Sequence, residues 1–86
     1  MVSRDELIKV FTEISDFKEM KAFIEEILTP KEIEDFALRW KLLQELHEGS
    51  TQRSIASKYG ISLCKITRGS KILKKDNSTT KKILDR

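Results

Sequence analysis

Apolar residues recur at helical spacing along most of the chain, and capping residues divide them into separate segments. Ser3 and Glu6 form a capping-box pattern that predicts a helix over 4–14, and Asp16 can cap a second helix over 17–27. One bent helix is the alternative. The apolar positions of both helices are expected in a core: Leu7, Ile8, Phe11, Ile14, Met20, Phe23, Ile24 and Ile27.

A long helix is predicted next. Thr29 can accept a hydrogen bond from the free N–H groups of the first turn, Pro30 suits the first helical position, and Glu32 completes a capping box. The helix is expected to run to about Glu48 and to stop at Gly49. Its apolar face is expected to hold Ile33, Phe36, Ala37, Trp40, Leu43 and His47, widened by Leu42 and Leu46.

Two short helices follow, and their spacing predicts a helix-turn-helix. Thr51 can cap a helix over 52–59, and Ser62 can cap another from Leu63 to about Leu73. The turn between them contains Gly60, which adopts positive φ without a steric penalty. An ordinary helical hairpin is the alternative. The expected inward positions are Ile55, Ala56, Tyr59, Ile61 and Ile66.

Composition agrees with a single small helical domain. The 86 residues include only three Gly and one Pro, too few for a many-stranded β fold, and 38% are apolar, which is little core material. Either the helices form a compact bundle or two chains share a core. One Cys excludes an internal disulfide and a cysteine-rich zinc site, and no metal site is expected. No signal peptide or membrane span is evident, so a reducing cytoplasm is expected.

The charge is divided unevenly along the chain. Residues 1–48 carry seven Lys or Arg and twelve Asp or Glu, a net charge of −5, whereas residues 49–86 carry ten and two, a net charge of +8. This asymmetry indicates a polyanion partner, with a solvated lysine-rich surface as the alternative. No acidic residue lies between Gly49 and Lys75, although a solvated helix normally mixes charges of both signs. The absence favours a nucleic acid as the partner.

The outward positions of this basic half carry the side chains expected to contact DNA. The first residues of the second helix meet base edges in such motifs, while the first helix and flanking lysines meet phosphates. Arg53 and Lys65 are the leading base-edge candidates, and Cys64 is interpreted as a small contact residue, with redox regulation as the alternative. Phosphate contacts are expected from Lys58, Lys71 and Lys74. The remaining expected DNA contacts are Gln52, Leu63 and Thr67.

Four stretches resemble the bacterial tryptophan (Trp) operon repressor family. They are LTPKE at 28–32, Arg39, QRSIA at 52–56 and, most specifically, ITRGSKILK at 66–74. The resemblance extends over about residues 16–75 and implies an all-α helical bundle with a helix-turn-helix, assembled as an intertwined homodimer of the Trp repressor type. It implies one domain over residues 1–86, divided as follows: a dimerisation core at 1–48, the helix-turn-helix at 52–73 and a tail or short helix at 76–86.

The resemblance also implies L-tryptophan as a corepressor ligand, with no other cofactor. By position, Arg39 would lie on one face of the indole, and Arg68 would lie on the other and reach the carboxylate. This chemistry is sensible, because a planar guanidinium stacks on aromatic rings and matches a carboxylate. A surface pairing of Arg39 with Asp35 is the alternative. The other implied ligand residues are Glu26, Leu28 and Thr29 near the ammonium group, Gly69 near the ring, and Ile72 at the position where the family's serine can bond the ammonium group.

Two departures from the family pattern bear on these expectations. The family often has a serine where this chain has Ile72, so we expect weaker tryptophan binding or an ammonium group held by backbone carbonyls alone. An unmatched buried polar contact costs about 1–3 kcal/mol. The turn at 49–51 is also one residue shorter than the family form, which would shift Gln52 and Arg53 relative to DNA.

The function implied is that of a repressor of tryptophan metabolism or transport genes, which binds double-stranded operator DNA when L-tryptophan is present. It would act in the bacterial cytoplasm, on the nucleoid when bound to DNA. No nucleophile–base pair, phosphate-binding glycine loop or catalytic carboxylate cluster is evident, so enzyme activity is not expected. Three alternatives remain: a regulator of the same fold that ignores tryptophan, a helical protein-interaction module, and a non-specific nucleic-acid binder.

Overall fold

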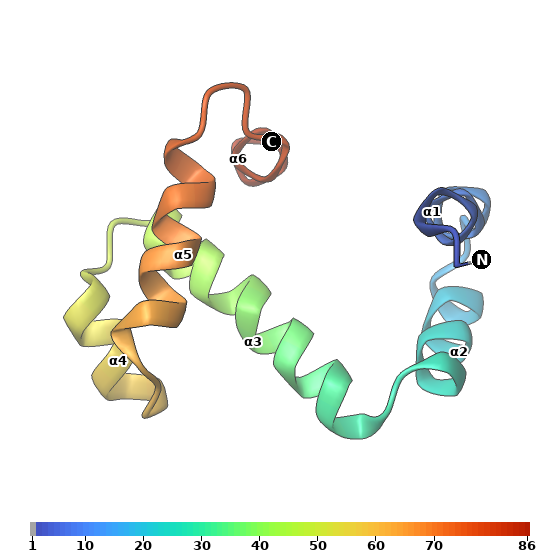
Figure 1. Ribbon diagram of the computed structural model, residues 1–86, viewed down its shortest axis with the longest axis horizontal. Coiled ribbons are helices and arrows are strands. Elements are labelled where there is room, and N and C mark those ends of the chain that lie inside the picture. Colours follow the sequence, from blue (N-terminus) through green and yellow to red (C-terminus); the bar gives the residue numbers. More distant parts are fainter. Residues whose placement is uncertain (1) are drawn as a thin grey trace. The chain divides into compact units, whose positions relative to one another are not determined.

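The computed structural model describes residues 2–86, which form six α-helices and no β-strand (Figure 1). The expected all-α class is therefore confirmed. Two separate helices, not one bent helix, occupy the N-terminal segment. The elements are α1 (Arg4–Glu13), α2 (Phe17–Ile27), α3 (Pro30–His47), α4 (Gln52–Tyr59), α5 (Leu63–Lys74) and α6 (Thr79–Leu84). Each expected helix is present; the bounds of α1 to α5 differ from expectation by one residue at most, and α6 lies within the expected tail or short helix at 76–86.

Side-chain caps explain most of these helix starts. At α3 the capping box is complete: the N–H of Thr29 donates to Glu32 Oε1 at 2.8 Å, and the N–H of Glu32 donates to Thr29 Oγ1 at 3.2 Å. Asp16 and Thr51 accept from the backbone in the same way at α2 and α4. Ser62 departs from expectation. It occupies the N-cap position of α5, but its side chain makes no capping hydrogen bond.

The chain divides into two compact units, one ending at Glu34 and the other comprising residues 35–86. In the first unit, α1 and α2 meet through Phe11 and Phe23, whose rings pack edge to face with centroids 5.6 Å apart. This geometry is favourable for aromatic pairs. No residue of α1 or α2 is buried.

The apolar residues of α1 and α2, which were expected in a core, are therefore not buried within the single chain. Leu7, Ile8 and Ile27 are 44%, 55% and 44% exposed, and Phe17 at the start of α2 is 80% exposed. Two short helices can cover only one stripe of each other, so the remaining apolar surface stays open to solvent. Exposed apolar surface on this scale is typical of a protein that associates with another chain.

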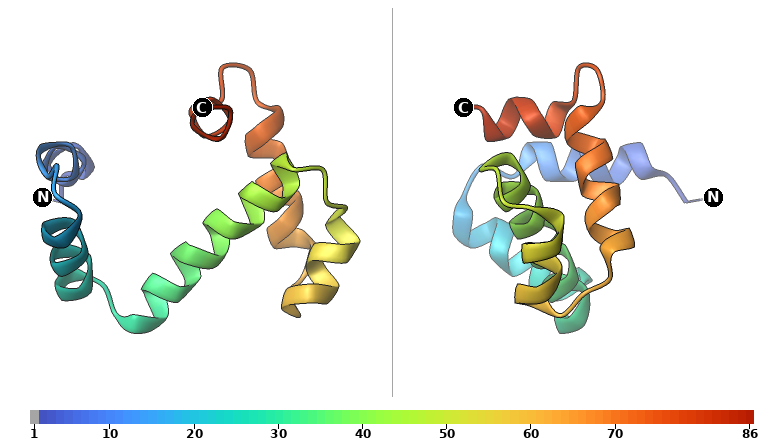
Figure 2. Two further views of the ribbon diagram at one scale, coloured as in Figure 1. Left: turned by 180° about the vertical axis from the view of Figure 1, so that it is seen from behind. Right: turned by 90° about the vertical axis from the view of Figure 1, so that its left-hand side faces the viewer.

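The second unit contains the core of the chain. Leu42 of α3, Ile55 of α4 and Ile66 of α5 meet there, and Ile55 and Ile66 are almost completely buried. Figures 1 and 2 show α5 lying beside both α4 and the C-terminal part of α3. The inward positions expected for the helix-turn-helix are thereby confirmed. The partly buried residues that surround this core are Leu38, Leu46, Ala56, Tyr59 and Ile61.

The core-facing stripe of α3 differs from the one expected. Phe36 and Trp40, which were expected on its buried face, are 55% and 39% exposed. His47 is exposed as well, and its ring Nε2 lies 2.6 Å from Oδ1 of Asp85, the residue that follows α6. The reason is that α4 and α5 cover only the Leu38–Leu42 side of the helix. Trp40 is therefore not a core residue of the single chain.

Candidate nucleic-acid interface

The turn between α4 and α5 depends on the backbone of Gly60. This residue has φ 63° and ψ 38°, the left-handed conformation, and its N–H donates to the carbonyl of Ala56. Ile61 follows, and its N–H donates to the same carbonyl at 3.2 Å. The chain thus closes α4 and begins α5 within three residues, as expected for a helix-turn-helix.

A side-chain hydrogen bond joins the two helices of this motif. The hydroxyl of Thr67 in α5 donates to Oε1 of Gln52, the first residue of α4, at 3.0 Å, and the contact is partly buried. Both residues were expected to contact DNA. The structure places them against each other, so the Gln52 carbonyl and the Thr67 hydroxyl are used within the motif in the free chain.

The outer face of α5 forms a shallow hollow of about 350 Å³ lined by Cys64, Thr67, Arg68 and Lys71. Thr67, Arg68 and Lys71 follow Cys64 by three, four and seven positions, so the four residues share one face of the helix. Leu63 and Lys65 lie exposed at the start of the helix, with Leu63 47% exposed. An open face with two cations and no carboxylate in α4 or α5 has the electrostatic character of a phosphate-binding surface.

A charged cluster between α3 and α4 was not foreseen from the sequence. Glu45 of α3 is 8% exposed and accepts hydrogen bonds from the Tyr59 hydroxyl and from Lys58 Nζ, the latter at 3.1 Å. The Tyr59 bond, followed by Lys58, holds the pKa of Glu45 below its usual value, and the bond to Glu45 raises the pKa of Lys58. One signal was available: Glu45 lies seven residues after Leu38, on the core-facing stripe, where a carboxylate needs partners.

The expected tryptophan-binding residues fall on both units of the chain. Within the first unit, the Thr29 hydroxyl accepts from Glu32, while Glu26 and Leu28 lie just before it at the end of α2. The second unit carries the other expected residues: Arg39, Arg68, Gly69 and Ile72. Ile72 is half-buried and Arg68 is exposed.

Two of these ligand candidates have specific contacts inside the second unit. The guanidinium of Arg39 lies over the Phe36 ring, 5.5 Å from its centroid, and none of the ion pairs within residues 2–86 joins it to Asp35. Gly69 is buried against α3, where an added Cβ would lie 3.2 Å from Leu46 Cδ1. A side chain at position 69 would therefore require the end of Leu46 to move by a few tenths of an ångström.

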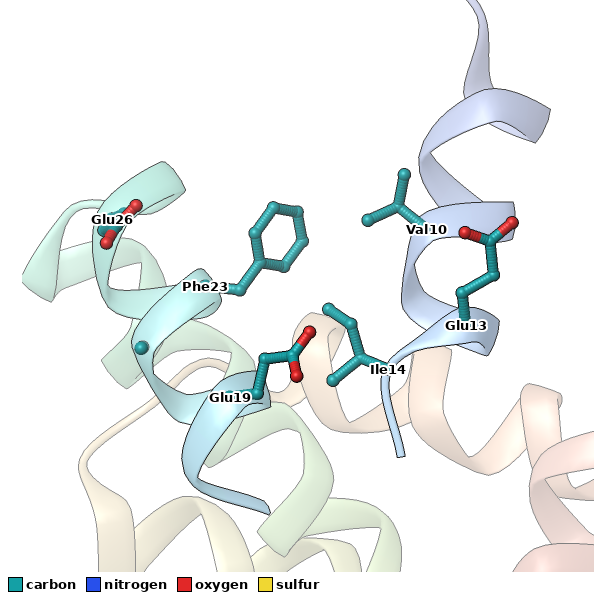
Figure 3. A pocket seen from close by; sticks show the side chains of 7 residues that line it. Val10, Glu13, Ile14, Glu19, Phe23 and Glu26 are labelled. Carbon is teal, nitrogen blue, oxygen red and sulfur yellow. The ribbon is translucent and has the colours of Figure 1, made fainter. Parts of the chain in front are cut away.

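The first unit has a hollow of different character between α1 and α2, of about 480 Å³. Figure 3 shows Val10, Ile14 and Phe23 directed into the space between the two helices. Three carboxylates also line it: Glu13, Glu19 and Glu26. Negative charge around an apolar floor disfavours phosphate, so the first unit does not offer a DNA-binding surface here.

Taken together, the fold and the basic face of α5 define an all-helical protein built around a helix-turn-helix. The chain belongs to the Trp repressor protein family, whose pattern it matches over residues 3–86. This family comprises transcription regulators and not enzymes.

Several relatives support this assignment. A Trp operon repressor homolog from Xylella fastidiosa (strain M23) is 40% identical over 72 residues, covering 83% of this chain and 78% of the relative. A Trp operon repressor homolog from Chlamydia trachomatis serovar L2 is 45% identical over 56 residues, covering 64% and 60%. No solved structure shows significant similarity to the chain. None of the helices within residues 2–86 is long and apolar enough to cross a membrane.

Proposed function

We propose that this protein is a sequence-specific DNA-binding repressor of tryptophan-related genes, which acts on the bacterial chromosome in the cytoplasm. The observation that carries the proposal is the exposed, basic face of α5, presented by a helix-turn-helix with a complete internal core. The similarity to Trp operon repressor homologs supports the same function. Leu63, Cys64 and Lys65 would reach base edges, together with Arg53 from α4, while Lys71 and Lys74 would contact phosphates.

The active form in this proposal is a homodimer. The first unit has no buried residue in its two complete helices, and a second hollow of about 290 Å³ there is lined mainly by apolar side chains, among them Phe17, Met20 and Ile24. Phe36 and Trp40 add exposed aromatic surface on α3. Two copies that share a core would cover these surfaces and hold two α5 helices roughly 34–36 Å apart, one turn of operator DNA.

L-Tryptophan is the proposed corepressor. Arg39 and Arg68 supply the two guanidinium groups expected around the ligand, and Arg39 already lies over an aromatic ring, that of Phe36. A guanidinium in this position can stack on an indole, and another can pair with the ligand carboxylate. The family resemblance adds Glu26, Leu28, Thr29, Gly69 and Ile72 as further proposed ligand residues.

One observation favours a second candidate, a repressor of the same fold that does not respond to tryptophan. Ile72 is half-buried and apolar at the position where the family often offers a serine hydroxyl. Without that hydroxyl, a bound ammonium group would depend on backbone carbonyls. Loss of one such hydrogen bond costs about 1–3 kcal/mol, which is roughly a fivefold to 150-fold loss of affinity.

The decisive experiment measures DNA binding with and without L-tryptophan. Duplexes selected by this protein from a random library would be titrated by fluorescence anisotropy, and calorimetry would follow millimolar L-tryptophan binding to the wild type and to Arg68→Ala. Tighter binding to the selected duplex with tryptophan supports the first candidate, and tryptophan-independent specific binding supports the second. Equal binding to selected and random duplexes indicates a non-specific binder, and no binding indicates a protein-interaction module.

A further inference from the structure

The Lys58 side chain is the one cation of the described helix-turn-helix that the structure pairs with a carboxylate. It extends from α4 to Glu45 of α3, and its ammonium lies 3.1 Å from the carboxylate. The two side chains differ in exposure, since that of Lys58 is 59% exposed and that of Glu45 only 10%. The pair therefore has one solvated partner and one that is largely removed from water.

We propose that Glu45 masks the charge of Lys58, and that this ion pair, by removing one cation from the DNA-binding surface, limits the affinity of the protein for DNA. The inference deepens the proposed function, because it concerns the same surface. It also departs from the sequence-based expectation that Lys58 contacts a phosphate. The mask would act on every DNA sequence alike, since it removes a charge and not a base contact.

The carboxylate cannot easily give up Lys58 to a phosphate. The Tyr59 hydroxyl also donates a hydrogen bond to Glu45. This bond would keep the carboxylate in its largely buried position if the Lys58 side chain moved away. If Lys58 moved to DNA, the largely buried carboxylate would lose the one cation that contacts it directly, with Lys41 acting only at longer range, and removing the partner of a buried charge is unfavourable. A surface pair, with both partners solvated, would exchange freely.

The arrangement also shows why the residue at position 45 determines whether the charge of Lys58 is available to DNA. Tyr59 directly follows Lys58 in α4, so both donors reach the same carboxylate from one turn of helix. A glutamine at position 45 keeps an oxygen for the Tyr59 hydroxyl and removes the negative charge. Glu45→Gln is therefore expected to preserve the packing of α4 on α3 while releasing Lys58.

Binding to a random-sequence duplex as a function of salt measures how many cations contact phosphates. Each phosphate contact adds about 0.9 to the slope of log K against log salt concentration. Glu45→Gln should tighten binding several-fold and steepen the slope by about 0.9. Lys58→Gln should leave the wild-type slope unchanged, whereas Lys74→Gln should reduce it by about 0.9. The double variant Glu45→Gln/Lys58→Gln should return to the wild-type slope.

A matched control separates the mask from a general change in net charge. Glu48→Gln removes one negative charge just after the same helix, at an exposed side chain. It should change the slope less than Glu45→Gln does. The proposal is overturned if Lys58→Gln lowers the slope as much as Lys74→Gln, or if Glu45→Gln and Glu48→Gln behave alike. Circular dichroism confirms that each variant is folded.

A second measurement distinguishes failure of the mask from failure of the proposed function. Elution from heparin reports on the same cations without operator DNA, and Glu45→Gln should elute at higher salt than Glu48→Gln. If that difference holds but no DNA sequence is preferred, the mask stands and the specific repressor function fails. If a selected operator is bound but the two variants elute together, the repressor function stands and the mask is wrong.

Discussion

Thr67 and Gln52 are joined across the helix-turn-helix by a hydrogen bond of 3.0 Å, from the hydroxyl of α5 to the side-chain carbonyl of α4. Two residues that the sequence assigned to DNA contact thus also hold the two helices together. The two residues lie fifteen positions apart in the sequence, and their hydrogen bond connects the start of α4 to the middle of α5. The bond therefore adds a polar contact between the two helices to the apolar contacts of their core.

Thr67→Val is expected to destabilise the folded chain by about 1 kcal/mol, because it removes this hydrogen bond and leaves the Gln52 carbonyl without its partner. Urea unfolding measures the change. Thr79→Val, at an exposed threonine in α6, is the control and should change stability little. In a double-mutant cycle with Gln52→Ala, a coupling energy near zero would show that the bond contributes nothing.

Gly60→Ala should destabilise the chain by about 1–2 kcal/mol, since an L-residue with a side chain is strained at φ 63°. No atom lies within 4 Å of the position that a Cβ would occupy, so the cost is conformational and not steric. Gly60→Asn should cost less, because asparagine tolerates this conformation. Thermal unfolding of the three proteins checks the order, and equal stability of the alanine and asparagine variants would contradict it.

Asp85 should make the stability of the chain depend on pH in the acidic range. The hydrogen bond from His47, together with Lys81 Nζ at 3.0 Å, lowers the pKa of Asp85 below its usual 3.8. A carboxyl group with a lowered folded-state pKa stabilises the chain above its unfolded pKa, and this stabilisation is lost as the pH falls through the folded value. Asp85→Asn should therefore be less stable than the wild type near neutral pH, and the difference should shrink below about pH 4.

Urea unfolding between neutral pH and pH 2.5 measures this convergence. Asp76→Asn, in the loop before α6, provides the matched control. The difference in stability between this variant and the wild type should not change with pH in the same way. A constant difference between the wild type and Asp85→Asn at all pH values would show that the His47 contact does not operate through the carboxylate charge.

Arg53→Ala and Lys74→Gln should affect DNA binding in different ways. Arg53 is proposed at a base edge, so its loss should weaken binding to the selected duplex by about 1–3 kcal/mol and leave random duplex almost unaffected. Lys74 is proposed at a phosphate, so its loss should weaken both duplexes equally. Anisotropy titrations with both duplexes test the assignment, with Lys9→Gln in α1 as the charge control. Reversal of the two patterns would show that the roles are exchanged.

Phe36→Asp should dissociate the proposed homodimer. Phe36 is 55% exposed in the single chain, and a carboxylate in place of this apolar ring would be costly to remove from water in a shared apolar core, even beside Arg39. Analytical ultracentrifugation should show the mass of a dimer for the wild type and of a monomer for the variant. Lys31→Asp, in the first turn of α3, is the control. A variant that remains a dimer would show that Phe36 lies outside the interface.

The helices could be predicted closely because their signals are local. The Thr29–Glu32 capping box and the glycine at position 60 act within one turn of backbone, so they are legible in the sequence and the structure reproduces them. Ile55 and Ile66 could likewise be placed in the core, since their spacing leaves each helix of the motif one apolar face. The family resemblance then named the class of protein.

Tertiary structure alone decided which faces are covered and which polar groups meet. Phe36 and Trp40 have the same apolar character as Leu42, yet only Leu42 is buried, because α4 and α5 pack on one side of α3. Glu45 and Lys58 are thirteen residues apart, and no local rule connects them. Their pairing arises when α4 folds back onto α3, since a carboxylate on a core-facing stripe is stable only beside donors that another helix supplies.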